Sequence, residues 1–269
     1  MNKKYRYFFE ISYSGTNFFG SQKQDSARTV FGLLEEILSK LFKLKIICIP
    51  CGRTDTGVHA YRSYCHCDFS FEFNPENVID TINHRGLSLG LFVHRIYRSD
   101  LHALSDVIQR TYSYYFTFDS SLPHYLYHSI SLIQELPLFI PTTTEMRRIF
   151  LGHRNYYSLC NYGSDVKTYL REIYNVAIIE QEYESLFGKK HDIYCINISG
   201  NGFLYKMIRH IVGLTLHSMT NFTNISRLID YFVAYQPISY SLAPVQGLHL
   251  TEVKYNNTKV GIDNEKETN

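Results

Sequence analysis

Residues 51–60 read CGRTDTGVHA and form the densest group of chemistry-bearing residues in this 269-residue chain. The segment follows a short apolar run and precedes residues 64–69, YCHCDF, whose alternating pattern predicts a strand. Its two glycines permit a tight turn or the close approach of a ligand. Arg53 and Asp55 are two residues apart, so an extended backbone places both side chains on one face. The segment therefore predicts a functional loop next to a strand.

The pair Arg53 and Asp55 allows two interpretations. A neighbouring guanidinium stabilises a carboxylate and lowers its pKa, which suits an ionised nucleophile or base at neutral pH. A structural ion pair that braces a turn has the same composition, and such pairs also perturb pKa values. These residues alone leave both interpretations open.

Hydrophobic periodicity predicts the other elements of the first half of the chain. Apolar residues at helical spacing, with Thr29 as a plausible N-cap, predict a helix over residues 29–42. A second helix is expected to begin at Pro75 and to end near His84. Strands are expected over residues 5–13, 45–50, 91–97 and 109–118. Residues 14–17 form a turn in this interpretation.

The second half repeats the mixture of strands and helices. After an irregular stretch over 122–141, we expect helices at 144–153 and 203–219, a strand pair at 170–180 and 192–199, and a last strand at 248–255. Strands that neighbour each other like hairpins favour an α+β fold with a largely antiparallel sheet over a parallel, doubly wound one. The expected division is an N-terminal half (1–120), a connection (121–143), a C-terminal half (144–256) and a disordered polar tail (257–269).

Composition excludes several classes of protein. Hydrophobic residues make up 45% of the chain and charged residues 19%, which argues against a disordered protein. The formal net charge of +2 excludes a histone-like polycation but not a basic face on a nucleic-acid-binding protein. No apolar run is long enough to span a membrane, and Glu10 interrupts a possible signal peptide, so we expect a cytoplasmic protein. No phosphate-binding glycine motif of a nucleotide site is present.

Four of the six cysteines suggest a metal site. Cys48 and Cys51 have the spacing of a zinc knuckle, and Cys65 and Cys67 follow soon after. Against zinc, only one residue separates the second pair, and both of its members fall in a predicted strand. Because free cysteine is commonly buried, we expect no metal, and a zinc-stabilised nucleic-acid module stays a minor alternative.

Residues 52–60 resemble the catalytic signature of the tRNA pseudouridine synthase A family. Other segments resemble motifs of that family in the same order along nearly the whole chain: residues 13–22 (YSGTNFFGSQ), 102–103 (HA), 110–114 (RTYSY), 150–152 (FLG), 202–213 (GFLYKMIRHIVG) and 243–250 (APVQGLHL). These motifs are more specific for the family when taken together than any one of them is alone.

The resemblance implies a fold, a reaction and partners. The implied fold is that of pseudouridine synthases, with two similar α/β halves around a mainly antiparallel sheet and a central active-site cleft. The implied reaction converts uridine to pseudouridine at positions 38, 39 and 40 of the tRNA anticodon stem-loop, and it needs no metal or organic cofactor. Family members are homodimers, which implies a homodimer here too.

The resemblance also implies roles for four residues. Asp55 is the essential carboxylate, expected as the nucleophile, although attack on C1′, addition to C6 and removal of the C2′ proton all stay open. Tyr112 is expected to pack on the target base, and stacking of a base on an aromatic ring contributes roughly 1–3 kcal/mol. Arg209 is placed beside Asp55 or a substrate phosphate. Arg53 is expected to hold the backbone of the flipped nucleotide.

Flipping a base out of a stem costs a few kcal/mol, which phosphate contacts in a basic groove can offset. Candidates for such contacts are Lys23, Arg28, Arg62, Arg110, Arg154 and Lys206. His59 is expected to make a local structural or RNA contact rather than to act as a base.

The chain departs from the family pattern at several positions, and these departures bear on RNA contacts and substrate range. They are Ser14, Ser21, Phe31, Ser63, Arg154, Asn155, Tyr156, Leu159 and Cys160. The alternative function is a catalytically silent tRNA-binding or RNA-folding protein on the same scaffold. The joint presence of Asp55, Tyr112 and Arg209 disfavours it, because binding alone does not require that carboxylate.

Overall fold

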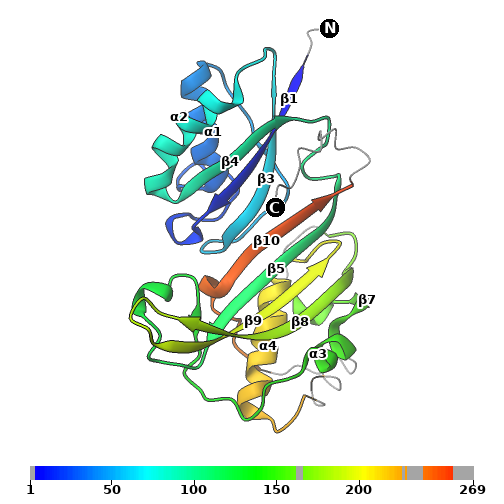
Figure 1. Ribbon diagram of the computed structural model, residues 1–269. Helices are drawn as coiled ribbons and strands as arrows, with labels where there is room; N and C mark the ends of the chain where they lie inside the picture. Colours follow the sequence, from blue (N-terminus) through cyan, green and yellow to red (C-terminus); the bar gives the residue numbers. More distant parts are fainter. Residues whose placement is uncertain (1–3, 162–165, 226–227, 229–238, 257–269) are drawn as a thin grey trace, which may run out of the picture.

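One ten-stranded sheet runs the length of the molecule in the computed structural model (Figure 1), which describes residues 4–161, 166–225, 228 and 239–256. Its main path follows the order β4-β1-β3-β10-β5-β9-β8-β7, while the short β2 and β6 pair with β3 and β5. The strands are β1 (Tyr5–Tyr13), β2 (Ile49–Pro50), β3 (His59–Phe69), β4 (Leu91–Arg98), β5 (Val107–Thr117), β6 (Ser131–Leu132), β7 (Gly152–Asn155), β8 (Leu170–Glu184), β9 (Lys190–Gly200) and β10 (Leu248–Tyr255).

Most of the strand pairs are antiparallel, and β10 and β3 meet in a short parallel contact. The last strand of the chain therefore lies between two strands of the first half. The predicted α+β class with a mainly antiparallel sheet is confirmed.

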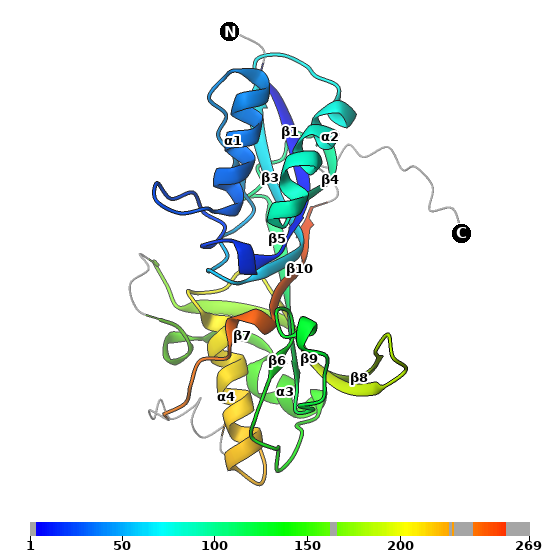
Figure 2. The ribbon, with the colours of Figure 1, turned by 90° about the vertical axis from the view of Figure 1, so that its left-hand side faces the viewer.

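Among the described residues, four α-helices pack against this sheet, and Figures 1 and 2 show α1 and α4 on the same side of it. The helices are α1 (Val30–Phe42), α2 (Pro75–Gly86), α3 (Thr143–Phe150) and α4 (Met207–Asn221), with short 3-10 turns at Gly15–Asn17, Leu87–Leu89, His124–Leu126, Tyr157–Leu159 and Val245–Gly247. The predicted starts of α1 and α2 are confirmed. The Thr29 hydroxyl accepts a hydrogen bond from the Gly32 amide at 3.2 Å, and Pro75 occupies the first turn of α2.

Two large apolar clusters fill the helix side of the sheet. One gathers α1, α2 and the inner face of β1 and β3, and the other gathers α3, α4 and the inner face of β5, β8 and β9. Tyr112 packs against both clusters from its place on β5. It therefore marks the junction of the two halves of the core.

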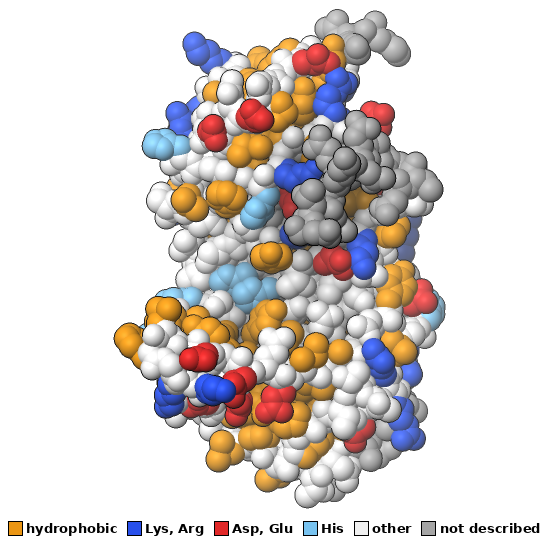
Figure 3. Space-filling view, in the orientation of Figure 1, with side chains coloured by type: hydrophobic (Ala, Val, Ile, Leu, Met, Phe, Trp, Pro, Cys, Tyr) orange, Lys and Arg blue, Asp and Glu red, His pale blue; other side chains and the backbone are white. Residues whose placement is uncertain are grey.

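The opposite face of the sheet is polar around β5 and β10. Because side chains alternate along a strand, Thr111, Ser113 and Tyr115 of β5 point away from the side that holds Tyr112. With residues of β8, β9 and β10 they line a second hollow of about 820 Å³. Figure 3 views this face, and its middle shows pale blue histidine among white atoms, which belong to the backbone and to side chains that are neither hydrophobic nor charged.

Several predicted bounds are wrong. The helix expected over 144–153 ends at Phe150, because Gly152 adopts a φ of +92° and begins β7, which pairs with β8. Only residues 49–50 of the expected strand over 45–50 belong to the sheet, whereas β3 begins at His59, before the alternating segment. The polar tail, residues 257–269, lies outside the described residues.

Candidate active site

The loop of residues 51–58, here called the Asp55 loop, connects β2 to β3 and is held by buried polar side chains. The Ser21 hydroxyl accepts a hydrogen bond from the Thr54 amide at 2.8 Å, and the Ser21 amide donates to the Thr54 carbonyl at 3.0 Å. The hydroxyls of Tyr13 and Thr54 share a further hydrogen bond of 2.8 Å. Ser21, one of the departures from the family pattern, therefore anchors the backbone next to Asp55.

The loop closes in a tight turn just after Asp55. The Val58 amide donates to the Asp55 carbonyl at 3.2 Å, and Gly57 has a φ of +83° at the third position of this turn. A Cβ atom on Gly57 would lie 2.8 Å from a methyl group of Val245, and one on Gly15 would lie 2.2 Å from the Val58 carbonyl oxygen. Gly57 therefore serves the tight turn that the sequence indicated, and Gly15, outside this loop, is required by the close approach of the Val58 backbone.

The Asp55 carboxylate is half-buried and has neither an ion pair nor a side-chain hydrogen bond to any residue that the structure describes. Burial raises its pKa, while the charges of Lys206 and Arg209 act in the opposite direction. The expectation that Arg53 lowers the pKa of Asp55 is therefore wrong. Arg53 is exposed, and the cations that act on Asp55 come from the start of α4.

The start of α4 places these two cations. Lys206 is the N-cap residue and has a φ of +59°, so residues 203–206 form a loop rather than the first turn predicted for a helix over 203–219. Arg209 lies in the first turn of the helix, and its Nε atom donates to the Ala243 carbonyl at 2.8 Å. The Ala243 amide donates in turn to the Arg209 carbonyl at 3.2 Å. Arg209 is thereby held in position beside the Asp55 loop.

Tyr112 lies close to Asp55 on the central strand β5. The carboxylate charge contributes to the raised pKa of the Tyr112 phenol, although burial is the larger cause. The ring of Phe203 meets the Tyr112 ring edge-on, with centroids 5.4 Å apart. An aromatic surface therefore stands beside the carboxylate.

These residues line one cleft of about 1230 Å³ between α1 and α4. Its wall includes Asp55, Tyr112, Arg53 and Arg209, so the structure brings together all four residues that the sequence singled out. Six basic side chains, including those two arginines, line the cleft, against the carboxylates of Asp55 and Glu35. Such a surface suits a polyanion with exposed bases.

Only some of the six candidate phosphate contacts lie at the cleft. Lys23, Arg110 and Lys206 line it, whereas Arg28, Arg62 and Arg154 do not. Lys23 is paired with Glu35, with Nζ and Oε2 2.8 Å apart. Arg110 is occupied by the protein itself, as described next.

The Arg110 guanidinium joins the two halves of the site. Its Nε atom donates to the Cys51 carbonyl at 3.1 Å, Nη2 donates to the same oxygen, and Nη1 donates to the Asn201 carbonyl at 3.4 Å. Cys51 begins the Asp55 loop, and Asn201 follows β9. Arg110 is therefore a brace between the two segments rather than a free phosphate ligand.

Sequence reasoning missed Arg171, which also lines the cleft. Its Nη1 atom donates to the carbonyls of Thr168 and Leu170, and burial lowers its pKa. No local pattern distinguishes Arg171 from the other charged residues on β8. Its role depends on the long-range pairing that places the start of β8 at the cleft.

His59 holds a turn at the back of the Asp55 loop. Its Nδ1 atom accepts a hydrogen bond from the Gly15 amide at 3.2 Å, and its ring stacks on His249 with centroids 4.6 Å apart. Burial lowers the pKa of His59 to about 4, with a smaller contribution from His249. At neutral pH this side chain is an uncharged structural group.

Comparison with known proteins supports one family. A family model for tRNA pseudouridine synthase matches residues 146–256. A protein named tRNA pseudouridine synthase A from a Geobacillus species is 31% identical over 255 residues, covering 92% of this chain and 97% of the relative. A protein of the same name from Bdellovibrio bacteriovorus is 30% identical over 254 residues, covering 92% and 94%. A third, from Chlamydia trachomatis, is 30% identical over 212 residues, covering 77% and 75%.

No helix in the described part of the chain is long and apolar enough to cross a membrane. Each of the first two matches covers 92% of the chain and so extends over both halves of the fold. On this evidence, the chain belongs to the tRNA pseudouridine synthase A family.

Proposed function

We propose that this protein isomerises uridine to pseudouridine in tRNA, at positions 38, 39 and 40 of the anticodon stem-loop, with Asp55 as the nucleophilic carboxylate. The observation that carries the proposal is the position of Asp55 in the cleft. This half-buried carboxylate, without a partner among the described residues, faces a basic cleft beside an aromatic ring. Family membership supports tRNA as the substrate.

The chemistry requires one carboxylate. The N1–C1′ bond of the uridine breaks, the uracil turns within the cleft, and a C5–C1′ bond forms while the hydrogen at C5 leaves as a proton. A leaving uracil spreads its negative charge over O2 and O4, so no second carboxylic acid is needed, in contrast to the usual hydrolysis of an O-glycoside. In the proposed mechanism the Asp55 carboxylate attacks C1′ as the N1–C1′ bond breaks, and the resulting ester bond breaks again when C5 bonds to C1′. The proton lost from C5 passes to solvent, and N1 takes up a proton. The nearby charges of Lys206 and Arg209 favour the ionised form of Asp55.

The neighbouring groups fit supporting roles in this mechanism. Tyr112 offers its ring to the detached base and keeps it from leaving the cleft. Arg53 is exposed on the wall of the cleft, where its guanidinium can reach a phosphate of the flipped nucleotide. Arg209 uses Nε to bind the protein backbone and leaves its charge directed at Asp55 or a phosphate.

The burial of Asp55 also disfavours a silent RNA-binding protein. The raised pKa means that the fold destabilises the charged form of this side chain. Binding of RNA does not require a desolvated carboxylate, and perturbed pKa values of this kind are common at active sites.

We further propose a cytoplasmic homodimer divided into the halves 1–120 and 144–256, joined by residues 121–143. The family resemblance supports the dimer, and the polar sheet face opposite the cleft offers a surface that lies away from the active site. Sedimentation equilibrium of the purified protein tests this part: a monomer at micromolar concentration contradicts it.

The reaction is tested with anticodon-arm RNA that carries tritium at C5 of a single uridine. Three substrates, labelled at position 38, 39 or 40, are incubated separately with the wild-type protein. We expect release of tritium to water from each, because joining C1′ to C5 expels that hydrogen. Tight RNA binding without release from any substrate contradicts the proposal and favours the silent binding protein.

A further inference from the structure

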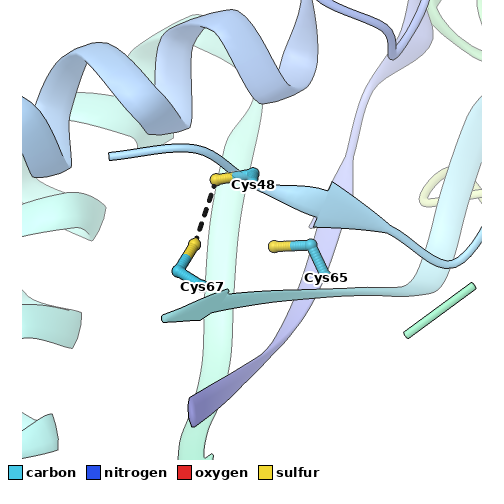
Figure 4. A group of neighbouring side chains, drawn as sticks. All are labelled: Cys48, Cys65 and Cys67. Carbon is cyan, nitrogen blue, oxygen red and sulfur yellow. Dashed lines mark hydrogen bonds between the residues drawn. The ribbon is translucent and has the colours of Figure 1, made fainter. Parts of the chain in front are cut away.

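Three cysteine side chains converge next to the cleft. The Sγ atoms of Cys48, Cys65 and Cys67 all lie within 4.8 Å of one another, and those of Cys48 and Cys67 are 3.3 Å apart (Figure 4). All three residues are buried and have free thiols. Among the residues that the structure describes, this is the one group of three or more potential metal ligands within such distances.

The sheet explains why these three meet. Cys65 and Cys67 are two residues apart on β3, so both side chains point to the face that packs under α1. Ile49 pairs with His66 and Pro50 with Cys65, so Cys48, just before β2, comes to the same face. Cys51 is not part of the group, because its sulfur lies 3.5 Å from the Ser63 hydroxyl and accepts from the Tyr64 amide.

The cluster has a polar neighbour and lies beside the cleft. Glu35 is buried on α1 and accepts a hydrogen bond from the Cys48 amide at 2.9 Å through Oε1. Cys48 and Glu35 both line the cleft, at the end that also holds Lys23. Cys48 is therefore the member of the cluster that lies nearest to the cleft.

We propose that Cys48, Cys65 and Cys67 form a binding site for one soft, thiophilic metal ion of the Zn²⁺ or Cu⁺ class. Thiolate ligands select these ions over harder ones. As each metal–sulfur bond forms, the corresponding S–H bond breaks and its proton passes to solvent, with no change in oxidation state. The site is separate from Asp55 and does not depend on the proposed reaction.

The geometry favours a metal over a disulfide. A bond between Cys48 and Cys67 would leave Cys65 unused, although its sulfur lies equally within the cluster. An ion bound by all three sulfurs uses every member of this buried cluster. A metal ion supplies positive charge that offsets the cost of deprotonation.

A bound ion would have a structural effect. It would join the segment before β2 to β3, three residues before Cys51 begins the Asp55 loop. A ligand that binds the native state stabilises it, so we expect a rise in the thermal midpoint when the ion is present.

The test uses the reduced, full-length protein without oxygen. Zn²⁺ and a weakly chelated Cu⁺ are added in separate samples, excess metal is removed, and the bound metal is measured per chain. We expect one ion per chain for at least one metal, and X-ray absorption should show three sulfur ligands at about 2.3 Å. The two metals distinguish which member of the class is preferred.

Cys67→Ala should lose stoichiometric binding, whereas Cys195→Ala, a buried cysteine on β9 in the other half, should keep it. Well below one ion per chain for both metals, or a ligand shell of oxygen and nitrogen, overturns the proposal. Equal binding by Cys67→Ala overturns it too. If Cys67→Ala does not fold, the X-ray absorption of the wild-type protein still decides whether sulfur atoms bind the ion.

Discussion

Replacing Arg110 by Met tests whether this side chain braces the Asp55 loop or binds a phosphate of the tRNA. The change keeps much of the side-chain volume and removes the guanidinium that donates to the carbonyls of Cys51 and Asn201. A hydrogen bond to a charged group contributes about 1.5–3 kcal/mol, and the longer bond to Asn201 contributes less. Because water can reach part of this site, we expect the free energy of unfolding to fall by about 2–4 kcal/mol. That leaves a folded protein, since a domain is typically stable by about 5–15 kcal/mol.

The effect on turnover follows from the same contacts. Without the brace, the Asp55 loop loses its anchor at Cys51, and a displacement of about 1 Å at a reacting group can cost about a hundredfold in rate. We expect Arg110→Met to lower kcat by about 10- to 100-fold with little change in KM for tRNA. The assays are tritium release under steady-state conditions and urea denaturation. Arg28→Met, which removes an exposed cation outside the cleft, is the matched control.

The opposite pattern would refute this reasoning. If Arg110 mainly binds a phosphate, Arg110→Met should raise KM, weaken the salt dependence of tRNA binding and leave kcat and stability unchanged. From the sequence, Arg110 was one of six candidates for such a phosphate contact.

Three further predictions test other parts of the site. Gly57→Ala places a Cβ on a residue with a φ of +83° and should lower the free energy of unfolding, measured in urea, by roughly 1–2 kcal/mol. Gly202→Ala, which has open space at its Cβ, should leave it unchanged. Equal effects of the two changes would contradict the requirement for glycine in the turn at Gly57. Burial holds the pKa of His59 and His66 at about 4, below the value of the unfolded chain. The free energy of unfolding should therefore be highest above about pH 6.5 and fall between pH 6.5 and 4, by up to roughly 3 kcal/mol for each histidine. Thermal midpoints that stay constant over this pH range would contradict this prediction. Lys206→Gln removes a charge that lowers the pKa of Asp55, so the acid limb of the pH profile of kcat/KM should move to higher pH. A shift to lower pH would contradict this effect of Lys206 on Asp55.

Local patterns predicted most of the individual elements. Alternation predicted β1 and β10 with the bounds that the structure has, and the cap at Thr29 marked the start of α1. The two wrong helix bounds fall where the backbone adopts a positive φ, at Gly152 and Lys206. A left-handed residue ends or delays a helix without changing the apolar pattern on which the prediction rests.

The sequence predicted which residues belong to the site but not how they contact one another. The motif resemblance identified Asp55, Tyr112 and Arg209, and the structure places all three around one cleft. The predicted effect of Arg53 on the carboxylate was wrong, because proximity in sequence does not measure distance between charges. The brace by Arg110 and the position of Arg171 depend on strand pairings between residues far apart in the chain, which no local pattern encodes.

The most direct measurement is tritium release from C5-labelled anticodon-arm RNA by Asp55→Asn, in single turnover with enzyme in excess and with RNA binding measured on the same samples. We expect release to be abolished while RNA binding stays within about threefold of wild type. The variant should be at least as stable as the wild type, because it removes a charge whose burial the fold disfavours. Release at the wild-type rate by a correctly folded Asp55→Asn would contradict the central role of this carboxylate.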